Sequence, residues 1–376
     1  MKKIGALLPH SVQAMPEGKS TFVAVYGLVL IIAWIVVGAA NVAGKGDDWR
    51  IFWGAGHNVG SLALVTASHF AYTPGAAWLL WPFAHLPIAT GYYIYVVLMT
   101  ACATLAALLA SKIYHLPFEV AALMALAWAP FTVAICLGQN SPVALLCVVI
   151  VIFAIVHNDQ PLSGIGLGFL IYKPSDAIAI AFLLAIFRQW WALIIAGVFA
   201  IGWYLLSVSA TRDWGWPIPY IQMLSTLYSR DAAMNSDFAI SVPTFLMRFG
   251  ISTPVAWLVG GTILFGSAPL LLRAPRLEAA SWVPLIGVAA SPHAWGYEAI
   301  LALPAFWLTT VRLNKISLVL LILSYLAAPF YLFVRAIHFN VLALPVLGGV
   351  MLWVCIRIQS KGCRPVEHTG MTKASD

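Results

Sequence analysis

Residues 88–111 read IATGYYIYVVLMTACATLAALLAS, a run of apolar and small polar residues without a single charge. A helix needs about 20 residues of this kind to cross the hydrocarbon core of a bilayer. Comparable apolar runs recur near residues 21–43, 118–137, 142–156, 191–210, 254–272, 277–290, 297–311, 316–334 and 341–358. The chain is therefore predicted to be an integral membrane protein built from helices.

The composition excludes the common alternatives to a membrane protein. Of the 376 residues, 62% are hydrophobic and only 9% are charged, whereas an average soluble domain is about a quarter charged. A transmembrane β-barrel would alternate apolar and polar residues, and this chain has continuous apolar runs instead. We expect an all-α, polytopic fold in which residues 1–376 form a single transmembrane domain.

The stretch 161–188 is long enough for one membrane span, but the sequence Tyr-Lys-Pro-Ser-Asp at residues 172–176 interrupts it. Proline lacks a backbone donor and disfavours helical geometry in the preceding residue. We therefore predict two short segments that turn at Lys173, which gives about 12 membrane segments in total. When the stretch is counted as two segments, thirteen of the 20 Lys and Arg residues face the cytoplasm, as the positive-inside rule requires.

This topology predicts two outer loops, at residues 44–77 and 211–253, and a cytoplasmic tail at residues 359–376. Both termini are expected in the cytoplasm, and a bacterial inner membrane is the expected location. The run at 21–43 is longer than the core of a signal peptide, so we interpret it as a retained first helix. Any chemistry is then expected at the outer membrane face.

Several partner and cofactor classes are excluded. The basic residues are scattered at the ends of apolar runs, which does not indicate nucleic-acid binding. The chain has no phosphate-binding loop of an ATP-driven pump. No CxxC pair occurs among the five cysteines, so we expect neither a disulfide framework nor a zinc site, and no metal or other cofactor is predicted. The cysteines are Cys102, Cys136, Cys147, Cys355 and Cys363.

Polar residues cluster at five places on the expected outer side. Either Asp47 or Asp48, next to an aromatic-rich segment, is a candidate general base; the alternative is a solvated helix cap. The other places contain Tyr72 in an aromatic turn, the amides of Gln139 and Asn140, and Lys173 at the helix break. Lys173 is a candidate phosphate ligand, with snorkelling to the interface as the alternative.

The fifth place reads Ser-Pro-His-Ala-Trp-Gly-Tyr-Glu, at residues 291–298, and includes His293, Tyr297 and Glu298. In their order, the five places resemble glycosyltransferase family 87, a family of the GT-C superfamily of membrane enzymes that use polyprenyl-phosphate sugars. The resemblance extends from about residue 47 to residue 303. Thr73 stands where the family often has a first proline, and Glu298 where it commonly has aspartate.

The resemblance implies a hexosyltransferase that moves a sugar, commonly mannose, from a polyprenyl-phosphate donor to a lipid or glycan acceptor. The family's base maps best onto Asp48, with Asp47 as the rival. Lys173 and His293 map onto the residues near the donor phosphate. Tyr72, Gln139, Asn140, Tyr297 and Glu298 are then expected to bind the sugar or the acceptor.

The expected mechanism is direct displacement. A single carboxylate base without a second carboxylate nucleophile favours inversion at the anomeric carbon. The alternative function is a transporter or flippase of lipid-linked sugars, which would place charges deep within its spans. In this sequence the charges cluster at one face, which favours an enzyme.

Overall fold

The computed structural model describes residues 47–66, 69–234 and 239–311, together with Gly349. The segments expected near 21–43, 316–334 and 341–358, and the tail at 359–376, lie outside these residues. Throughout the described part the regular elements are helices, and the β-structure there is a single isolated bridge between Ala239 and Trp295. The all-α prediction is therefore confirmed for this part of the chain.

The helices follow one another with short connections. In chain order they are α2 (Asp47–His57), α3 (Ala63–Thr66), η1 (Pro74–Ala76), α4 (Ala77–Ala84), α5 (Ile88–Tyr114), α6 (Phe118–Leu126), α7 (Ala129–Leu137), α8 (Ser141–His157), α9 (Gln160–Leu170), α10 (Pro174–Ile186), α11 (Trp190–Thr211), α12 (Pro217–Met234), α13 (Val242–Arg248), α14 (Thr253–Gly266), α15 (Ala268–Arg273), α16 (Arg276–Ala290), η3 (Gly296–Ala302) and α17 (Leu303–Val311).

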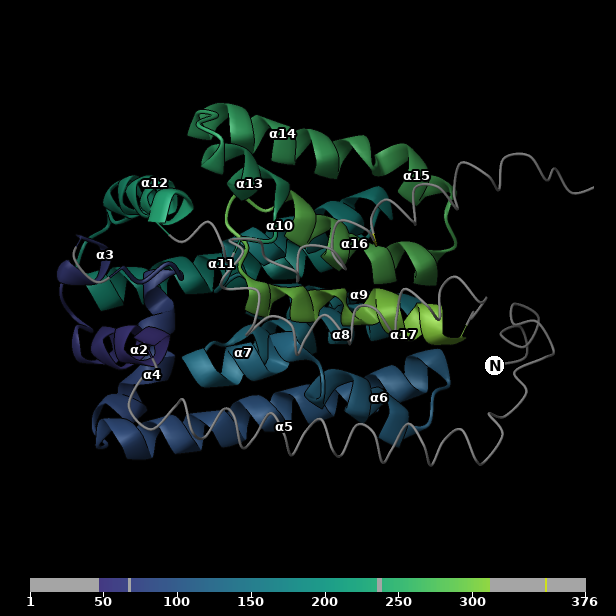
Figure 1. Cartoon of the computed structure of the whole chain (residues 1–376), viewed down its shortest axis with the longest axis horizontal. Helices are drawn as coiled ribbons and strands as arrows, with labels where there is room; N and C mark the ends of the chain where they lie inside the picture. The colour runs from purple at the N-terminus through teal and green to yellow at the C-terminus, as the bar shows by residue number, and fades with distance from the viewer. Residues whose placement is uncertain (1–46, 67–68, 235–238, 312–348, 350–376) are drawn as a thin grey trace, which may run out of the picture.

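The long helices lie side by side along the long axis of the molecule (Figure 1). Helices α2, α3, α4 and α12 gather at one end of this bundle, on the left of the view, and α6 and α15 lie towards the other end. The predicted loop at 211–253 thus contains two helices, α12 and α13. Because α12 carries many polar residues, hydropathy alone does not reveal it.

Within the described ranges, three helical stretches are long and apolar enough to cross a membrane: Ile88–Tyr114, Trp190–Thr211 and Thr253–Arg273. The pair α6 and α7 passes the same test together, but it is bent by 56° at a break. Pro130, in the first turn of α7, removes a backbone donor there. The buried Trp128 fills the break and packs edge-on against Phe306, at a centroid distance of 5.1 Å. The count of about 12 segments stays a prediction.

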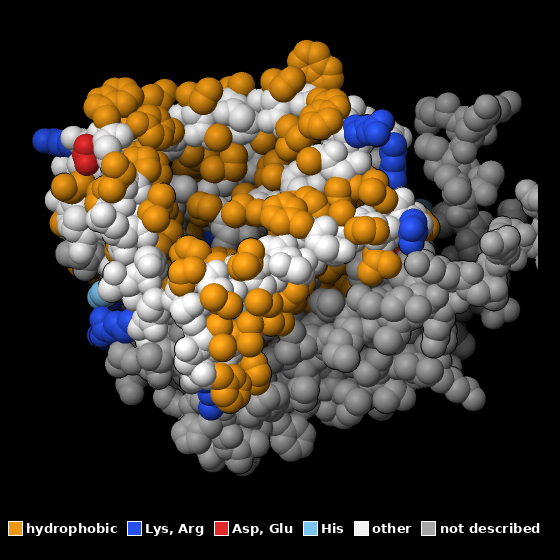
Figure 2. Space-filling view, turned by 90° about the horizontal axis from the view of Figure 1, so that it is seen from above, with side chains coloured by type: hydrophobic (Ala, Val, Ile, Leu, Met, Phe, Trp, Pro, Cys, Tyr) orange, Lys and Arg blue, Asp and Glu red, His pale blue; other side chains and the backbone are white. Residues whose placement is uncertain are grey.

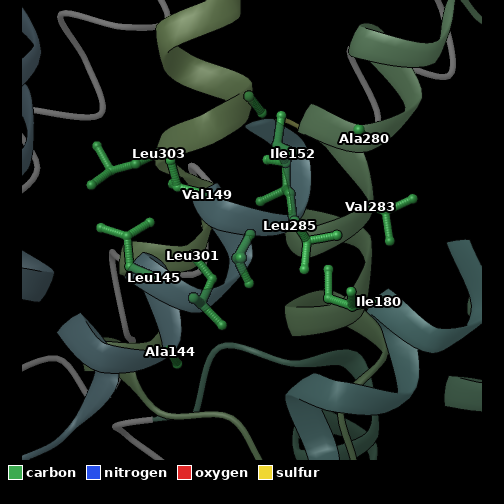
Figure 3. Close-up of a cluster of buried hydrophobic side chains, with 14 of the residues drawn as sticks. Ala144, Leu145, Val149, Ile152, Ile180, Ala280, Val283, Leu285, Leu301 and Leu303 are labelled. Atoms are coloured by element: carbon green, nitrogen blue, oxygen red, sulfur yellow. The ribbon is translucent and has the colours of Figure 1, made fainter. Parts of the chain in front are cut away.

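The core lies where α8 packs against its neighbours. Small residues line the face of α5 that meets α8, which lets the two backbones approach closely, as is common between membrane helices. These residues are Ala103, Ala106, Ala107 and Ala110, all fully buried. On its other sides α8 contacts α16 and η3 through branched side chains such as Val149, Ile152 and Leu285 (Figure 3).

Helices α9 and α10 form the down-and-back pair expected for the stretch 161–188. Lys173, in the turn between them, lies at the same end of the bundle as Glu298. At the opposite end, the guanidinium of Arg276 lies 5.9 Å from the Phe187 ring and donates a 2.8 Å hydrogen bond to Asn158. The chain therefore runs towards Lys173 along α9 and away from it along α10.

Close packing fixes the position of this pair. A Cβ atom on Gly164 of α9 would lie only 2.6 Å from the carbonyl oxygen of Ala192, so glycine is required where α9 meets α11.

The outward faces of the long helices are apolar. In the most apolar 18-residue window of each candidate span, the buried share is 33% for Ile88–Tyr114, 22% for Trp190–Thr211 and 28% for Thr253–Arg273. Figure 2 shows many hydrophobic side chains on the described part of the face on the α14 side, with a hollow near its middle.

Candidate active site

The site begins with the first turn of α2, where Asp48 is half-buried. The next residue, Trp49, is 2% exposed and anchors the helix. Its indole nitrogen donates a 2.9 Å hydrogen bond to the carbonyl oxygen of Ile88, and its ring packs against Tyr95 and Phe83 at centroid distances of 4.9 and 5.9 Å. Because Trp49 fixes this face of α2, the Asp48 carboxylate is held at the end of the bundle.

A tight turn brings a second element to Asp48. Helix α7 ends at Leu137, and Gly138 follows with a φ of 77°, in the left-handed region that favours glycine. A Cβ atom on Gly138 would lie 2.6 Å from the Cβ of Trp49. Glycine is therefore needed both for the turn and for the approach of α7 to α2. The residue that this turn delivers to the site is Gln139.

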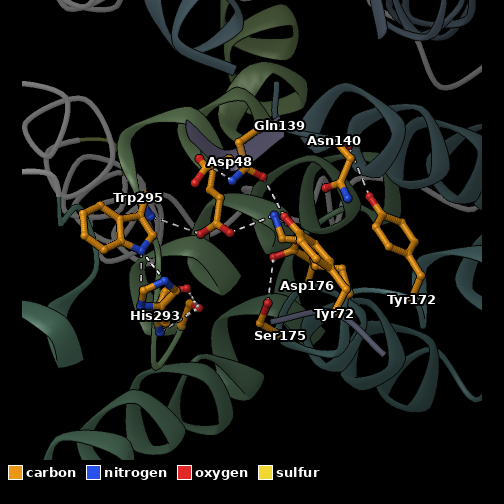
Figure 4. A network of polar contacts seen from close by, with 12 residues as sticks. Asp48, Tyr72, Gln139, Asn140, Tyr172, Ser175, Asp176, His293 and Trp295 are labelled. Carbon is orange, nitrogen blue, oxygen red and sulfur yellow. Dashed lines mark hydrogen bonds and ion pairs between the residues drawn. The ribbon is translucent and has the colours of Figure 1, made fainter. Parts of the chain in front are cut away.

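The Gln139 side chain is 4% exposed, and protein partners engage both ends of its amide. Its Nε2 donates a 2.7 Å hydrogen bond to Oδ2 of Asp48, and its Oε1 accepts a 2.7 Å hydrogen bond from the Tyr72 hydroxyl (Figure 4). Burial raises the pKa of Tyr72, and the carboxylates of Glu298 and Asp48 raise it further, so the phenol stays a neutral donor. The amide orientation is thereby fixed.

Lys173 lies in the turn between α9 and α10 and is 4% exposed. Its ammonium nitrogen is 2.7 Å from Oε1 of Glu298 and 3.1 Å from Oδ2 of Asp176, and it lies 5.9 Å from the centre of the Tyr297 ring. Burial alone would lower the pKa of Lys173, but the two carboxylates outweigh burial and raise this pKa. The other oxygen of Glu298 accepts a 3.2 Å hydrogen bond from the backbone N–H of Trp295.

His293 lies in the loop between α16 and η3. Its ring stacks on Tyr228 of α12, with a centroid distance of 4.4 Å and an interplanar angle of 6°, and the Trp295 indole nitrogen contacts it. Asp231 of α12 is 3.8 Å away. Burial, and then the charge of Lys173, lowers the pKa of His293 to about 3. The imidazole is therefore neutral at physiological pH and offers one N–H donor.

The remaining side of the site is aromatic. The rings of Tyr72 and Tyr172 stack at a centroid distance of 5.9 Å, and the backbone N–H of Thr73 donates to the carbonyl oxygen of Tyr172. The Tyr172 hydroxyl donates a 3.2 Å hydrogen bond to the backbone oxygen of Asn140. The side-chain oxygen of Asn140 is buried and has no hydrogen-bond partner among the described residues. It is thus an acceptor that a ligand hydroxyl can satisfy.

The structure brings nearly all the predicted site residues together in one polar network (Figure 4). Hydrogen bonds, ion pairs or ring contacts link Asp48, Tyr72, Gln139, Asn140, Lys173, His293, Tyr297 and Glu298 to this cluster or to its immediate neighbours. Asp47 begins α2, but its side chain lies outside the described residues.

Sequence reasoning missed four contributors to this site. Asp176 follows Lys173 by three residues at the start of a helix, a spacing that brings side chains together and that could have revealed it. Tyr228, Asp231 and Trp295 surround His293. Asp231 falls within the predicted outer loop at 211–253, and no local pattern indicates that α12 folds back onto residues more than 60 positions away.

A model of glycosyltransferase family 87 matches residues 70–292, more than half of the chain. Comparisons with curated proteins and with solved structures give no match. The matched residues include Tyr72, Gln139, Asn140 and Lys173, while Asp48 lies before them and His293 directly after them. The predicted resemblance is therefore confirmed: the chain, whose described part is helical, is a glycosyltransferase that belongs to glycosyltransferase family 87.

Proposed function

We propose that this glycosyltransferase moves a hexose, with mannose as the first candidate, from a polyprenyl-phosphate donor to a hydroxyl of a lipid or glycan acceptor. The observation that carries the proposal is the hydrogen bond of 2.7 Å between Gln139 and Asp48 at the end of the bundle that also holds Lys173. A carboxylate, an oriented amide and a cation from three distant segments thus share one site. Their chemistry fits a base and a phosphate ligand.

Asp48 acts as the general base. Gln139 holds one of its carboxylate oxygens, so the carboxylate is oriented to take the proton of the acceptor hydroxyl. The acceptor oxygen then forms a bond to the anomeric carbon as the bond from this carbon to the phosphate oxygen breaks. The electron pair of the broken bond stays on the phosphate. One displacement of this kind inverts the configuration of the anomeric carbon.

Lys173 and His293 stabilise the charge that develops on the leaving phosphate. The Lys173 ammonium has three donors, of which two face carboxylates. The third donor is the one that we assign to the phosphate. His293 contributes a neutral N–H, because its pKa is lowered to about 3. Preoriented donors of this kind stabilise developing charge without reorganisation at the moment of reaction.

Substrate hydroxyls are assigned to Tyr72, Asn140 and Tyr297. The buried side-chain oxygen of Asn140, which no described residue engages in a hydrogen bond, supports this assignment. The sequence places Gln139 and Glu298 in the same group of residues. Since protein partners engage both of these side chains, we infer that they act by holding Asp48 and Lys173.

The donor's polyprenyl tail would lie against the apolar outer faces of the helices. Figure 2 shows a hollow in the apolar face on the α14 side. On α14 itself, Leu258 and Phe265 are 70% and 59% exposed. Burial of apolar area contributes roughly 25 cal/mol per Å², so a long isoprenoid chain needs no polar contacts to bind. A lipid-linked donor therefore suits this surface better than a water-soluble one.

We place the site on the outer, periplasmic side of a bacterial inner membrane, with both termini in the cytoplasm. The count over the full sequence supports this orientation through the positive-inside rule, because thirteen of the 20 Lys and Arg residues fall on the predicted cytoplasmic side. Of these thirteen, Lys112, Arg188, Arg273 and Arg276 are among the described residues. The alternative function, a transporter or flippase of lipid-linked sugars, is not favoured, because the family is one of glycosyltransferases.

A donor panel tests the proposed function. The purified protein in proteoliposomes is supplied with several polyprenyl-phosphate sugars, with the corresponding nucleotide sugars, and with lipid and glycan acceptors. We expect transfer from polyprenyl-phosphate sugars only, with inverted anomeric configuration in the product. Transfer from nucleotide sugars alone would contradict the proposal, and retained configuration would contradict the single displacement.

A further inference from the structure

Two carboxylates surround the ammonium of Lys173, although one would be enough to neutralise it. Asp176 and Glu298 both approach its nitrogen, at 3.1 and 2.7 Å, and all three side chains are about 95% buried. A single carboxylate neutralises a buried ammonium, and a second one adds repulsion between like charges. With all three groups ionised, the cluster carries a net charge of −1.

The two carboxylates differ in how the fold uses them. Glu298 makes the shorter ion pair, and its second oxygen accepts a hydrogen bond from the backbone N–H of Trp295 at the start of η3. Glu298 therefore ties the α9–α10 turn to η3. Asp176 makes the longer ion pair, and the one hydrogen bond that its other oxygen accepts from a described residue comes from the Ser175 hydroxyl, at 3.5 Å. Asp176 is the surplus charge.

The charge of the phosphate changes during the reaction of the proposed function. A polyprenyl-phosphate sugar is a phosphodiester with one negative charge. When the bond to the anomeric carbon breaks, the electron pair stays on the phosphate, and the product is a monoester with a charge of about −1.5 to −2 at pH 7. A second carboxylate that offsets the charge of Lys173 therefore weakens the attraction of this ammonium for the product more than for the donor.

We propose that Asp176 sets the phosphate affinity of this site: by placing a second carboxylate on Lys173, it weakens binding of the product phosphate and so favours product release. The inference rests on the proposed function, because it takes the phosphate of a lipid-linked donor as the ligand of Lys173. It assigns to Asp176 a role in turnover through the charge of the site. Asp176 does not contact the sugar or the acceptor in this proposal.

Binding of a polyprenyl monophosphate to the purified full-length protein tests the inference without turnover. D176N keeps the shape of the side chain and removes its charge, and we expect it to bind the monophosphate about tenfold more tightly than the wild type. Its gain for the phosphodiester donor is smaller, about threefold. D176E, which keeps the charge, stays near the wild type. Should D176N be poorly expressed, D176S makes the same comparison.

Two further variants separate charge from structure. In K173M/D176N the gain disappears, because it acts through Lys173. E298Q lowers the unfolding temperature, because Glu298 ties two elements together, whereas D176N leaves the unfolding temperature near that of the wild type. Unchanged, weaker or undetectable binding by D176N overturns the inference, as does a gain that persists without Lys173. A wild type that binds the monophosphate but transfers no sugar from lipid-linked donors would contradict only the proposed function.

Discussion

Gln139 is the side chain through which Tyr72 and Asp48 are connected. Replacing it by leucine removes both hydrogen bonds of 2.7 Å and leaves the Asp48 carboxylate free to turn away from the acceptor. We expect Q139L to lower kcat at least about tenfold while the donor KM changes less than twofold. Steady-state kinetics in proteoliposomes measures both constants.

The matched control for this variant is Q222L, because Gln222 is an exposed glutamine on α12. It should leave both constants near the wild-type values. If Q139L raised the donor KM and left kcat unchanged, Gln139 would be a ligand of the donor and not the residue that orients the base.

His293 makes the stability of the protein depend on pH. Burial, and then Lys173, lowers its pKa to about 3 in the folded state, while the unfolded value is about 6.5. Between these values the unfolded state binds one more proton, so stability falls as pH decreases below 6.5. From pH 7 to pH 5 we expect a loss of about 2 kcal/mol from this residue.

Unfolding measurements in detergent at pH 7 and pH 5 check this prediction. H293N should lose less stability on acidification than the wild type, and H157N, which changes an exposed histidine, should behave like the wild type. An equal loss of stability in H293N and the wild type would show that the imidazole is not buried in its neutral form.

At this scale the sequence predicted which polar residues come together at the site, but not all of their partners. Asp48, Lys173 and His293 stand out because charged and polar groups are rare near apolar runs. Asp231 does not stand out, because it lies among other charged residues of a predicted loop, and its contact with His293 depends on how α12 packs. Such long-range contacts leave no mark in the local sequence.

The turn after α7 is the element on which the geometry of the site depends most. Gly138 has a φ of 77°, and a Cβ atom there would lie 2.6 Å from Trp49. We therefore expect G138A to displace α2 from α7 and to lower both the unfolding temperature and kcat, with a loss of stability of about 2–3 kcal/mol. Thermal unfolding and turnover of the purified variant measure the two effects.

The control for the turn is G197A in α11, where a Cβ atom would have nothing within 4 Å. It should leave turnover unchanged and slightly raise the unfolding temperature, because alanine favours helix over glycine. If G138A were as stable and active as G197A, the approach of α7 to α2 would not be as close as described.

Helices were the most predictable elements, and their breaks the least. Hydropathy alone indicates α5, α8 and α11, because each is a continuous apolar run. The bend between α6 and α7 was not predicted, since it depends on Pro130 acting together with the packing of Trp128 against Phe306. The amphipathic helix α12 was predicted as part of a loop, because polar residues separate its apolar residues and no continuous apolar run marks it.

On the scale of the whole molecule, the fold collects residues that are far apart in the sequence. Asp48 and Gln139 are 91 positions apart, and Lys173 and Glu298 come from two further segments. Charge counting on the sequence predicts that these segments share one side of the membrane. It does not predict which side chains meet, because the helix packing that decides this is set by residues such as Gly138 and Gly164.

Turnover of D48N tests most directly whether this assembled site is the active site. Purified wild type, D48N and the control D213N are compared in proteoliposomes with a labelled polyprenyl-phosphate sugar; the Asp213 side chain accepts a hydrogen bond from the backbone N–H of Gly215. Loss of the base should reduce kcat of D48N at least about a hundredfold, while D213N and the unfolding temperatures stay near the wild type. Turnover of D48N within twofold of the wild type would contradict the account.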